Sequence, residues 1–171
     1  SLGISSHLIS VDSDANILYV YGDKYRRIDV TSSRPALNGY QMNKCFYCSE
    51  NISIIKNSDR ICNVDHFIPD TLQKRGFLSN LNGIWNLVLS CKSCNGMNEK
   101  GTKLPTRKFL EKLFRRNEYL VSSHEELKGT ILAQTGNTSS ARKAFLYSQY
   151  IIALDKLIHV WEPKPKGIEV F

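Results

Sequence analysis

Residues 85–95 read Trp-Asn-Leu-Val-Leu-Ser-Cys-Lys-Ser-Cys-Asn, and this stretch decides the fold that we expect for the middle of the chain. Residues 85–90 form a short apolar run of the kind that predicts a buried strand. The run leads directly into Cys91 and Cys94, a spacing that places two thiolates on one tight turn. We expect a helix to begin at Asn95 and to continue to about residue 100, before Gly101.

Residues 49–90, a stretch of 42, separate these cysteines from a second pair with the same spacing, Cys45 and Cys48. Four thiolates on two tight turns make a tetrahedral site that suits Zn²⁺ and leaves no position open for substrate. The sequence shows no export signal, so metal binding is favoured over disulfides. We therefore predict a structural zinc site; the alternative, unrelated buried cysteines, does not explain the equal spacing. The fifth cysteine, Cys62, is expected to be a small buried apolar residue.

The segment between the two pairs contains Val64-Asp65-His66-Phe67-Ile68-Pro69, which predicts a second short strand. Neighbouring residues on a regular strand point to opposite faces, so Asp65 and His66 can serve one site only where the strand ends or bulges. Pro69 agrees with an early end. The predicted order is strand, loop, strand and helix, which gathers a carboxylate, an imidazole and the amides of Asn86 and Asn95 around one point.

This pattern resembles the HNH (ββα-metal) endonuclease family in its zinc-knuckle form with two Cys-x-x-Cys pairs. The resemblance is carried by Asp65-His66-x-x-Pro69, by Asn86 and by Cys91-x-x-Cys94-Asn95, preceded by Cys45-x-x-Cys48. It covers roughly residues 44–103, about a third of the chain. Asn95 stands where many members have a histidine, so the chain corresponds to an H-N-N variant.

The resemblance implies that His66 is the general base and that Asp65 and Asn95 bind the catalytic divalent cation. Asn86 would tie the loop that carries the histidine. Carboxylate and amide oxygens suit Mg²⁺ or Mn²⁺, which would act as a Lewis acid on the scissile phosphate. An imidazole can accept the proton of the attacking water at neutral pH. The implied activity is hydrolysis of phosphodiester bonds in DNA, with RNA less favoured, leaving 5′-phosphate and 3′-hydroxyl ends.

The formal net charge of +7 favours a polyanionic partner, and one zinc bound by four thiolates lowers it to about +5. Asn98 replaces a lysine that many family members have, and Lys100 and Lys103 are candidates for its phosphate-binding role. Together with Lys92, Arg107 and Lys108 they would neutralise phosphates beside the cut. A solvated basic face without a ligand is the alternative. The basic pairs Arg115-Arg116 and Arg142-Lys143 are expected to be solvated helix charges.

The predicted fold class is α+β: a ββα-metal finger with a Cys₄ zinc site, preceded by a small antiparallel β segment and followed by helices. Four segments are expected: a β-hairpin with a short helix (1–43), the zinc-bearing nuclease core (44–104), a helical extension (105–162) and an extended, mobile tail (163–171). Strands are predicted at 8–11, 17–21 and 25–30. Helices are predicted from Ser33 to Gly39 or just after, and at 106–117, 123–136 and 139–161, the last with an apolar stripe that includes Leu154 and Ile158.

Hydrophobic residues make up 42% and charged residues 23%, as in a globular protein with a core, and no apolar run has the length of a membrane span. We expect a cytoplasmic protein that acts as a dimer or as a domain of a larger protein. Three functions are open: a DNA endonuclease, a catalytically inactive zinc-bearing module that binds nucleic acid, and a zinc-bearing protein-interaction domain. Restriction and phage defence are among the settings in which the family occurs, and the sequence does not choose between them.

Overall fold

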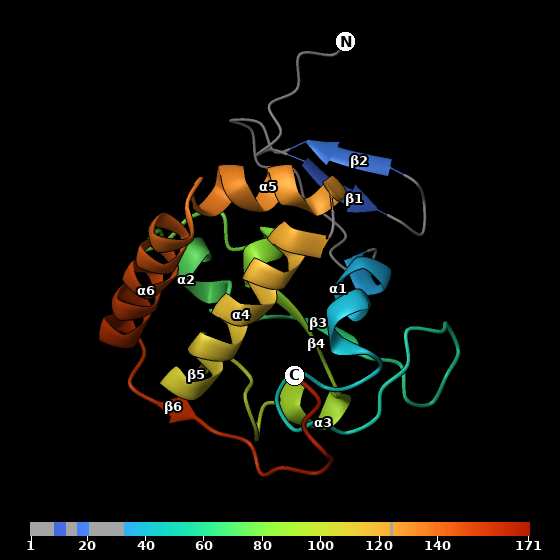
Figure 1. Ribbon diagram of the computed structural model, residues 1–171. Helices are drawn as coiled ribbons and strands as arrows, with labels where there is room; N and C mark the ends of the chain where they lie inside the picture. The colour runs from blue at the N-terminus through green and yellow to red at the C-terminus, as the bar shows by residue number, and fades with distance from the viewer. Residues whose placement is uncertain (1–8, 13–16, 21–32, 124) are drawn as a thin grey trace.

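A computed structural model describes residues 9–12, 17–20, 33–123 and 125–171 (Figure 1). Strands β1 (Ile9–Asp12) and β2 (Ile17–Val20) pair antiparallel, which confirms the predicted hairpin. The third strand predicted at residues 25–30 lies outside the described residues. Helix α1 (Arg34–Gln41) has Pro35 in its first turn, as predicted, and ends two residues beyond Gly39, at Gln41; Met42 caps it in the left-handed conformation (φ 51°).

The middle of the chain holds the second hairpin. Strand β3 (Asn63–His66) pairs antiparallel with β4 (Leu87–Ser90), and His66 lies opposite Leu87. Both strands were predicted, as was the end of β3 at the Asp-His pair. The side-chain amide of Gln41 bonds both the backbone N–H and the C=O of Leu89 at 2.8 Å, which fixes α1 to β4. The segment between the strands forms the short helix α2 (Thr71–Lys74) and the 3₁₀ helix η3 (Ile84–Asn86).

The prediction of a helix over residues 95–100 is wrong. Helix α3 (Lys92–Asn95) begins three residues earlier, because Cys91 Sγ accepts the Cys94 N–H as a cap, and it ends at Asn95. Gly96 is extended, and Gly101 adopts φ 48° where a Cβ would lie 3.3 Å from the Met97 backbone, so residues 96–102 form turns. The ββα order is therefore present only with a four-residue helix, and a full ββα-metal finger is not established.

Three longer helices follow: α4 (Arg107–Ser123), which crosses in front of the β3–β4 hairpin in Figure 1, and α5 (Glu125–Thr135) and α6 (Ser139–Lys156), which pack against α4 and each other. The predicted end of α4 at residue 117 is wrong, because the buried face of this helix continues through Leu120. The last helix ends at Lys156 rather than residue 161. The chain then forms β6 (Val160–Trp161), parallel to β5 (Leu104–Pro105), and Leu154 and Ile158 are exposed.

Two of the charges expected to be solvated are buried. Arg116 has no exposed surface and donates to the carbonyls of Leu87 and Ile84 at 2.6 and 3.0 Å, so α4 is bonded to the start of β4. Arg142 forms a two-point ion pair with Glu118. The buried apolar side chains of α1, the hairpin and the C-terminal helices make one continuous core. None of the helices in the described part of the chain is long and apolar enough to cross a membrane.

The tail has no helix or strand, in line with the extended tail that was predicted, but it contacts the rest of the chain. The chain after β6 runs past α3, and the backbone N–H groups of Lys166 and Gly167 both donate to the carbonyl of Cys48, at 2.9 and 3.1 Å (Figure 1). Phe171 packs against the ring of Tyr40, with the ring centroids 4.9 Å apart. These contacts hold the tail on the first Cys-x-x-Cys turn.

Candidate functional site

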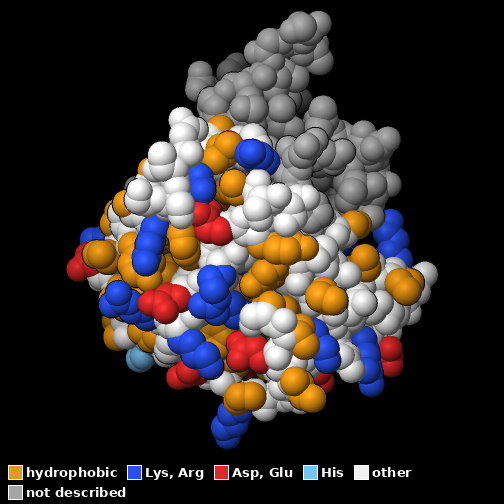
Figure 2. All heavy atoms as spheres, in the orientation of Figure 1, with side chains coloured by type: hydrophobic (Ala, Val, Ile, Leu, Met, Phe, Trp, Pro, Cys, Tyr) orange, Lys and Arg blue, Asp and Glu red, His pale blue; other side chains and the backbone are white. Residues whose placement is uncertain are grey.

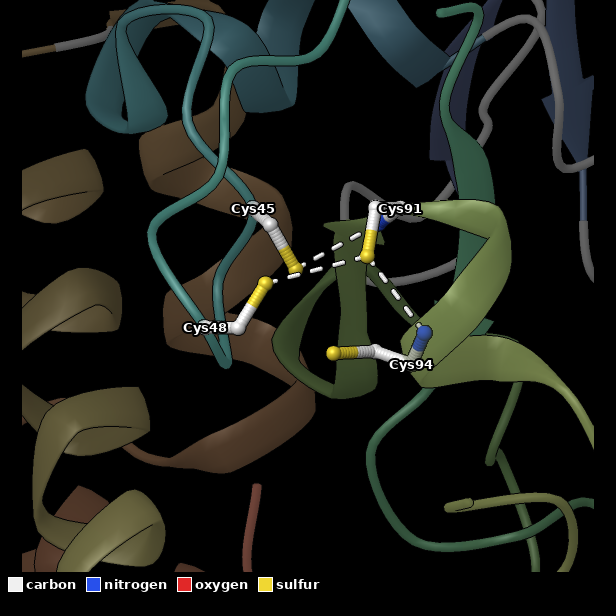
Figure 3. Close-up of side chains that lie close together, drawn as sticks. All are labelled: Cys45, Cys48, Cys91 and Cys94. Atoms are coloured by element: carbon white, nitrogen blue, oxygen red, sulfur yellow. Dashed lines mark hydrogen bonds between the residues drawn. The ribbon is translucent and has the colours of Figure 1, made fainter. Parts of the chain in front are cut away.

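The four paired cysteines form a buried cluster that can hold a metal ion. Cys45 and Cys48 lie on the loop after α1, while Cys91 and Cys94 lie at the start of α3, and the four sulfurs point toward one another (Figure 3). All four Sγ atoms lie within 4.8 Å of one another, and the Sγ atoms of Cys48 and Cys91 are 3.7 Å apart. A tetrahedron with Zn–S bonds of about 2.3 Å has S···S edges of about 3.8 Å, so the cluster fits zinc.

The electrostatics of the cluster also favour a cation. Contact with Cys45 is the largest of the effects that lower the pKa of Cys48 to about 7. The pKa of Cys94 is raised, because Cys45, Cys48 and Cys91 surround it. Without a cation, some of the thiols must keep their protons to avoid repulsion between adjacent thiolates. A bound Zn²⁺ removes that repulsion and holds all four in the thiolate form.

Asp65 lies at the end of β3, next to the cluster, and is 6% exposed. The hydroxyl of Tyr47, between the first two cysteines, donates to its Oδ2 at 2.6 Å. The ammonium of Lys100 lies 3.1 Å from the same oxygen and 3.3 Å from Oδ1. Burial, with the negative charge of Asp65 as the next cause, raises the pKa of Tyr47 well above its usual value, so the tyrosine remains a donor. Both carboxylate oxygens are therefore occupied by donors from the protein.

His66, the last residue of β3, is half-buried, and its Nε2 lies 2.7 Å from the side-chain oxygen of Asn82. An amide oxygen can only accept, so Nε2 carries the proton and the lone pair of the neutral ring is on Nδ1. Asp70 is close enough for the charge of His66 to affect it. Burial raises the pKa of Asp70, but the hydrogen bond from Lys74 and the charges of His66 and Lys74 outweigh burial, so the net shift is downward.

Asn86 is fully buried and joins the two ends of the segment between the strands. Its Nδ2 donates to the carbonyls of Ile68 and Leu81, both at 2.9 Å, and its Oδ1 accepts the N–H of Ile68 at 2.8 Å. Ile68 follows His66 by two residues, and Asn82, the partner of the His66 ring, follows Leu81. The amide of Asn86 therefore fixes both the loop that carries the histidine and the loop that orients its ring.

The site does not fit the divalent cation that the resemblance assigns to Asp65 and Asn95. Helix α3 lies beside β3, but the Asn95 side chain makes no hydrogen bond with Asp65 or His66, both of which are among the described residues. The backbone N–H of Asn95 donates to Cys91. Since the carboxylate of Asp65 already holds an ammonium and a hydroxyl, a divalent cation has no free oxygen pair there.

The basic residues predicted to contact phosphate differ in how exposed their side chains are. Lys92, Arg107 and Lys108 are exposed, and Arg107 lies over the ring of Tyr147, 5.4 Å from its centre. Lys103 is half-buried and donates to the carbonyl of Glu99 at 2.9 Å. Lys100 has no exposed surface, so in this conformation it does not reach a phosphate in solvent. On the face drawn in Figure 2, basic side chains alternate with acidic and apolar ones rather than forming one basic patch.

Sequence reasoning missed three features of this site. Tyr47 stands at a variable position inside a Cys-x-x-Cys turn, where nothing marks a polar role. Asn82 lies in the turn-rich stretch between Gly76 and Gly83, whose amides read as ordinary turn residues. Lys100 was noted as a basic residue, but no local pattern links it to Asp65, 35 residues earlier. The cysteine at position 62 is buried and outside the cluster, as predicted.

Comparisons of the chain with protein-family models, with curated proteins and with solved structures find no match.

Proposed function

We propose that the chain hydrolyses phosphodiester bonds in nucleic acid, DNA rather than RNA, at the end of β3, with His66 as the general base. The observation that carries the proposal is the double tether of His66: Asn86 fixes the loop after it, and Asn82 fixes the ring. A half-buried imidazole whose Nε2 is held, and whose Nδ1 makes no hydrogen bond with the described residues, is prepared to take a proton from water. The resemblance to the HNH family supplies the substrate class.

The surroundings of His66 include a carboxylate, since the charge of His66 is one of the causes that lower the pKa of Asp70. Asp70 is itself held in the ionised form by Lys74, 2.9 Å away. The net positive charge and the exposed Lys92 and Arg107 favour a polyanionic ligand whose affinity falls as salt rises.

The zinc cluster has a structural role in this proposal. Its four thiolates close the coordination sphere, so the metal contributes rigidity to the loops around β3 and takes no part in the reaction. The contacts of Asp65 and Asn95 do not support the Mg²⁺ or Mn²⁺ that the resemblance assigns to them. The assay below therefore measures cutting both with and without a divalent cation.

A plasmid-nicking assay tests the proposal on the zinc-loaded chain with Mg²⁺, with Mn²⁺ and with EDTA added to magnesium-free buffer. Wild type is expected to convert supercoiled DNA to open circles under at least one condition. His66→Ala should lower the rate by 10²-fold or more, on the order of what a general base contributes. His159→Ala is the matched control, since His159 is exposed and lies just before β6, where its carbonyl accepts the Leu104 N–H. Cutting by His66→Ala at the wild-type rate contradicts the assignment of the base.

A second candidate function is a zinc-bearing module that binds nucleic acid without cutting it. The ion pair between Lys100 and Asp65 favours it, because it gives the carboxylate a structural role. This candidate predicts salt-sensitive binding of a DNA duplex by gel shift and no cutting under any of the three conditions. A protein-interaction domain, in contrast, predicts no salt-sensitive binding to DNA or RNA.

A further inference from the structure

The ammonium of Lys100 has all of its hydrogen-bonding capacity satisfied at the end of β3. It lies 3.1 and 3.3 Å from the two oxygens of Asp65 and donates to the backbone carbonyl of His66 at 2.7 Å. An ammonium has three N–H donors, and three acceptors face it here. The Lys100 side chain is 1% exposed and that of Asp65 is 7% exposed, so water does not compete for either charge.

From this geometry we infer that Lys100 is a built-in counter-cation that closes the Asp65 site to divalent metal ions in the free protein. The ammonium of Lys100 occupies the position beside the Asp65 oxygens at which a metal ion would otherwise bind. The inference concerns the same site as the proposed function, and it changes which group supplies the positive charge beside His66.

The backbone holds Lys100 in this position. Its N–H donates to the carbonyl of Cys94 at 3.0 Å, and its own carbonyl accepts the N–H of Lys103 at 2.7 Å. The zinc cluster therefore anchors the turn that presents the lysine. Gly101, with φ 48°, completes the turn in a conformation that other residues rarely adopt. The backbone therefore holds the Lys100 side chain within reach of Asp65.

Displacement of Lys100 by a metal ion is unfavourable on energetic grounds. A divalent cation that binds Asp65 leaves the ammonium buried without its counter-charge, and removing one partner of a buried pair is strongly destabilising. The ion also has to displace or share the oxygen that accepts the Tyr47 hydroxyl. Asp65 is the only acidic group that contacts Lys100 among the described residues, so the ammonium has no alternative partner nearby.

The test measures Mn²⁺ binding to the zinc-loaded chain by the loss of the free-ion electron paramagnetic resonance signal. Wild type is expected to bind no Mn²⁺ at millimolar concentration. Lys100→Met is expected to gain one site per chain, and the double variant Asp65→Asn with Lys100→Met is expected to lose it again. Lys103→Met, which removes a lysine next to the same turn whose ammonium donates to the Glu99 carbonyl, should bind no Mn²⁺, like wild type.

Binding of one Mn²⁺ by wild type that is lost in Asp65→Asn overturns the inference. Failure of folded, zinc-loaded Lys100→Met to gain a site overturns it as well. If Lys100→Met does not retain zinc, Lys100→Gln, which keeps a donor, replaces it in the same comparison. Cutting of DNA is measured separately, so a wild type that cuts and binds Mn²⁺ through Asp65 keeps the proposed function and loses only the inference. If wild type neither cuts DNA nor binds Mn²⁺, the inference about Lys100 stands and the proposed function is lost.

Discussion

Asn86 and Ile68 are joined by a closed pair of hydrogen bonds: the amide nitrogen donates to the Ile68 carbonyl at 2.9 Å, and the amide oxygen accepts the Ile68 N–H at 2.8 Å. A third bond runs from the same nitrogen to Leu81. The buried side chain of Asn86 thereby satisfies backbone groups of Ile68 and Leu81 that lie outside the β3–β4 ladder. The position of His66 depends on this amide rather than on the strand alone.

We expect Asn86→Asp to lower the free energy of unfolding by about 3 kcal/mol or more, because a buried carboxylate would face two carbonyls without a donor. Urea unfolding of the zinc-loaded protein measures the change. Asn98→Asp, at an exposed position, is the matched control and should change the value by less than about 0.5 kcal/mol. Equal unfolding midpoints for wild type and Asn86→Asp would contradict the role of the amide.

Two of the Lys–Asp ion pairs among the described residues differ clearly in burial. Lys100 and Asp65 are buried, while Lys74 and Asp70 have side chains that are 70% and 33% exposed. Lys100→Met is expected to cost about 3–5 kcal/mol, because it leaves a buried carboxylate without its counter-charge. Lys74→Met should cost less than about 1 kcal/mol.

A double-mutant cycle by urea unfolding measures the coupling within the buried pair. Asp65→Asn combined with Lys100→Met should cost less than the sum of the two single changes, since neither partner is then left charged and alone. Additive costs would mean that the two groups are not paired in solution.

The metal content of the chain is a direct prediction from the cysteine cluster. Native mass spectrometry should find one zinc per chain, and Cys45→Ser should lose it and unfold the middle of the chain, because structural zinc supplies folding free energy in such sites. Cys62→Ser is the matched control: the residue is buried but outside the cluster, so the variant should keep its zinc. Retention of zinc and melting temperature by Cys45→Ser would rule out the arrangement.

The features that could be predicted from the sequence are local. A Cys-x-x-Cys spacing brings its own thiols together, and two equal pairs identified the cluster without knowledge of the rest of the fold. The same is true of the hairpin strands and of the start of α1 at Pro35, where composition acts over a few residues, although the Ser33 hydroxyl makes no cap hydrogen bond to the helix.

The features that could not be predicted depend on partners far apart in the chain. The β5–β6 pairing joins residues 104 and 160, and neither dipeptide carries a strand pattern of its own. The buried Arg116 has the local context of a surface residue, since only the distant carbonyls of Leu87 and Ile84 satisfy it. The helix expected after Asn95 failed for a different reason: Gly96 and Gly101 break a segment that has no apolar stripe to hold it helical.

The docked tail provides a test at one glycine. A Cβ at position 167 would collide with the backbone carbonyl of Ser49, and backbone cannot move aside cheaply. Gly167→Ala should therefore detach the tail, with a loss of about 1–3 kcal/mol that is typical of overpacking. Amide hydrogen exchange at Lys166 should accelerate, because its bond to Cys48 is lost. Ile168→Ala, at a residue 81% exposed, is the control and should leave that exchange unchanged; slow exchange in Gly167→Ala would contradict the docking.

The ion pair between Glu118 and Arg142 makes stability depend on pH in a defined direction. The two-point hydrogen bond from Arg142 lowers the pKa of Glu118 below its usual 4.5. A carboxyl group whose pKa is lower in the folded than in the unfolded state stabilises the fold above the unfolded pKa. This contribution is lost as the pH falls through the lower, folded pKa.

Glu118→Gln should therefore be less stable than wild type at neutral pH, by about 1 kcal/mol. The difference should shrink steadily below pH 4.5, where Glu118 begins to gain a proton in the unfolded chain. Thermal unfolding of both proteins over a falling pH series measures it, and acid effects on the zinc cluster cancel because both proteins contain it. A difference between wild type and Glu118→Gln that is the same at every pH would show that the ionised carboxylate is not what stabilises the contact between α4 and α6.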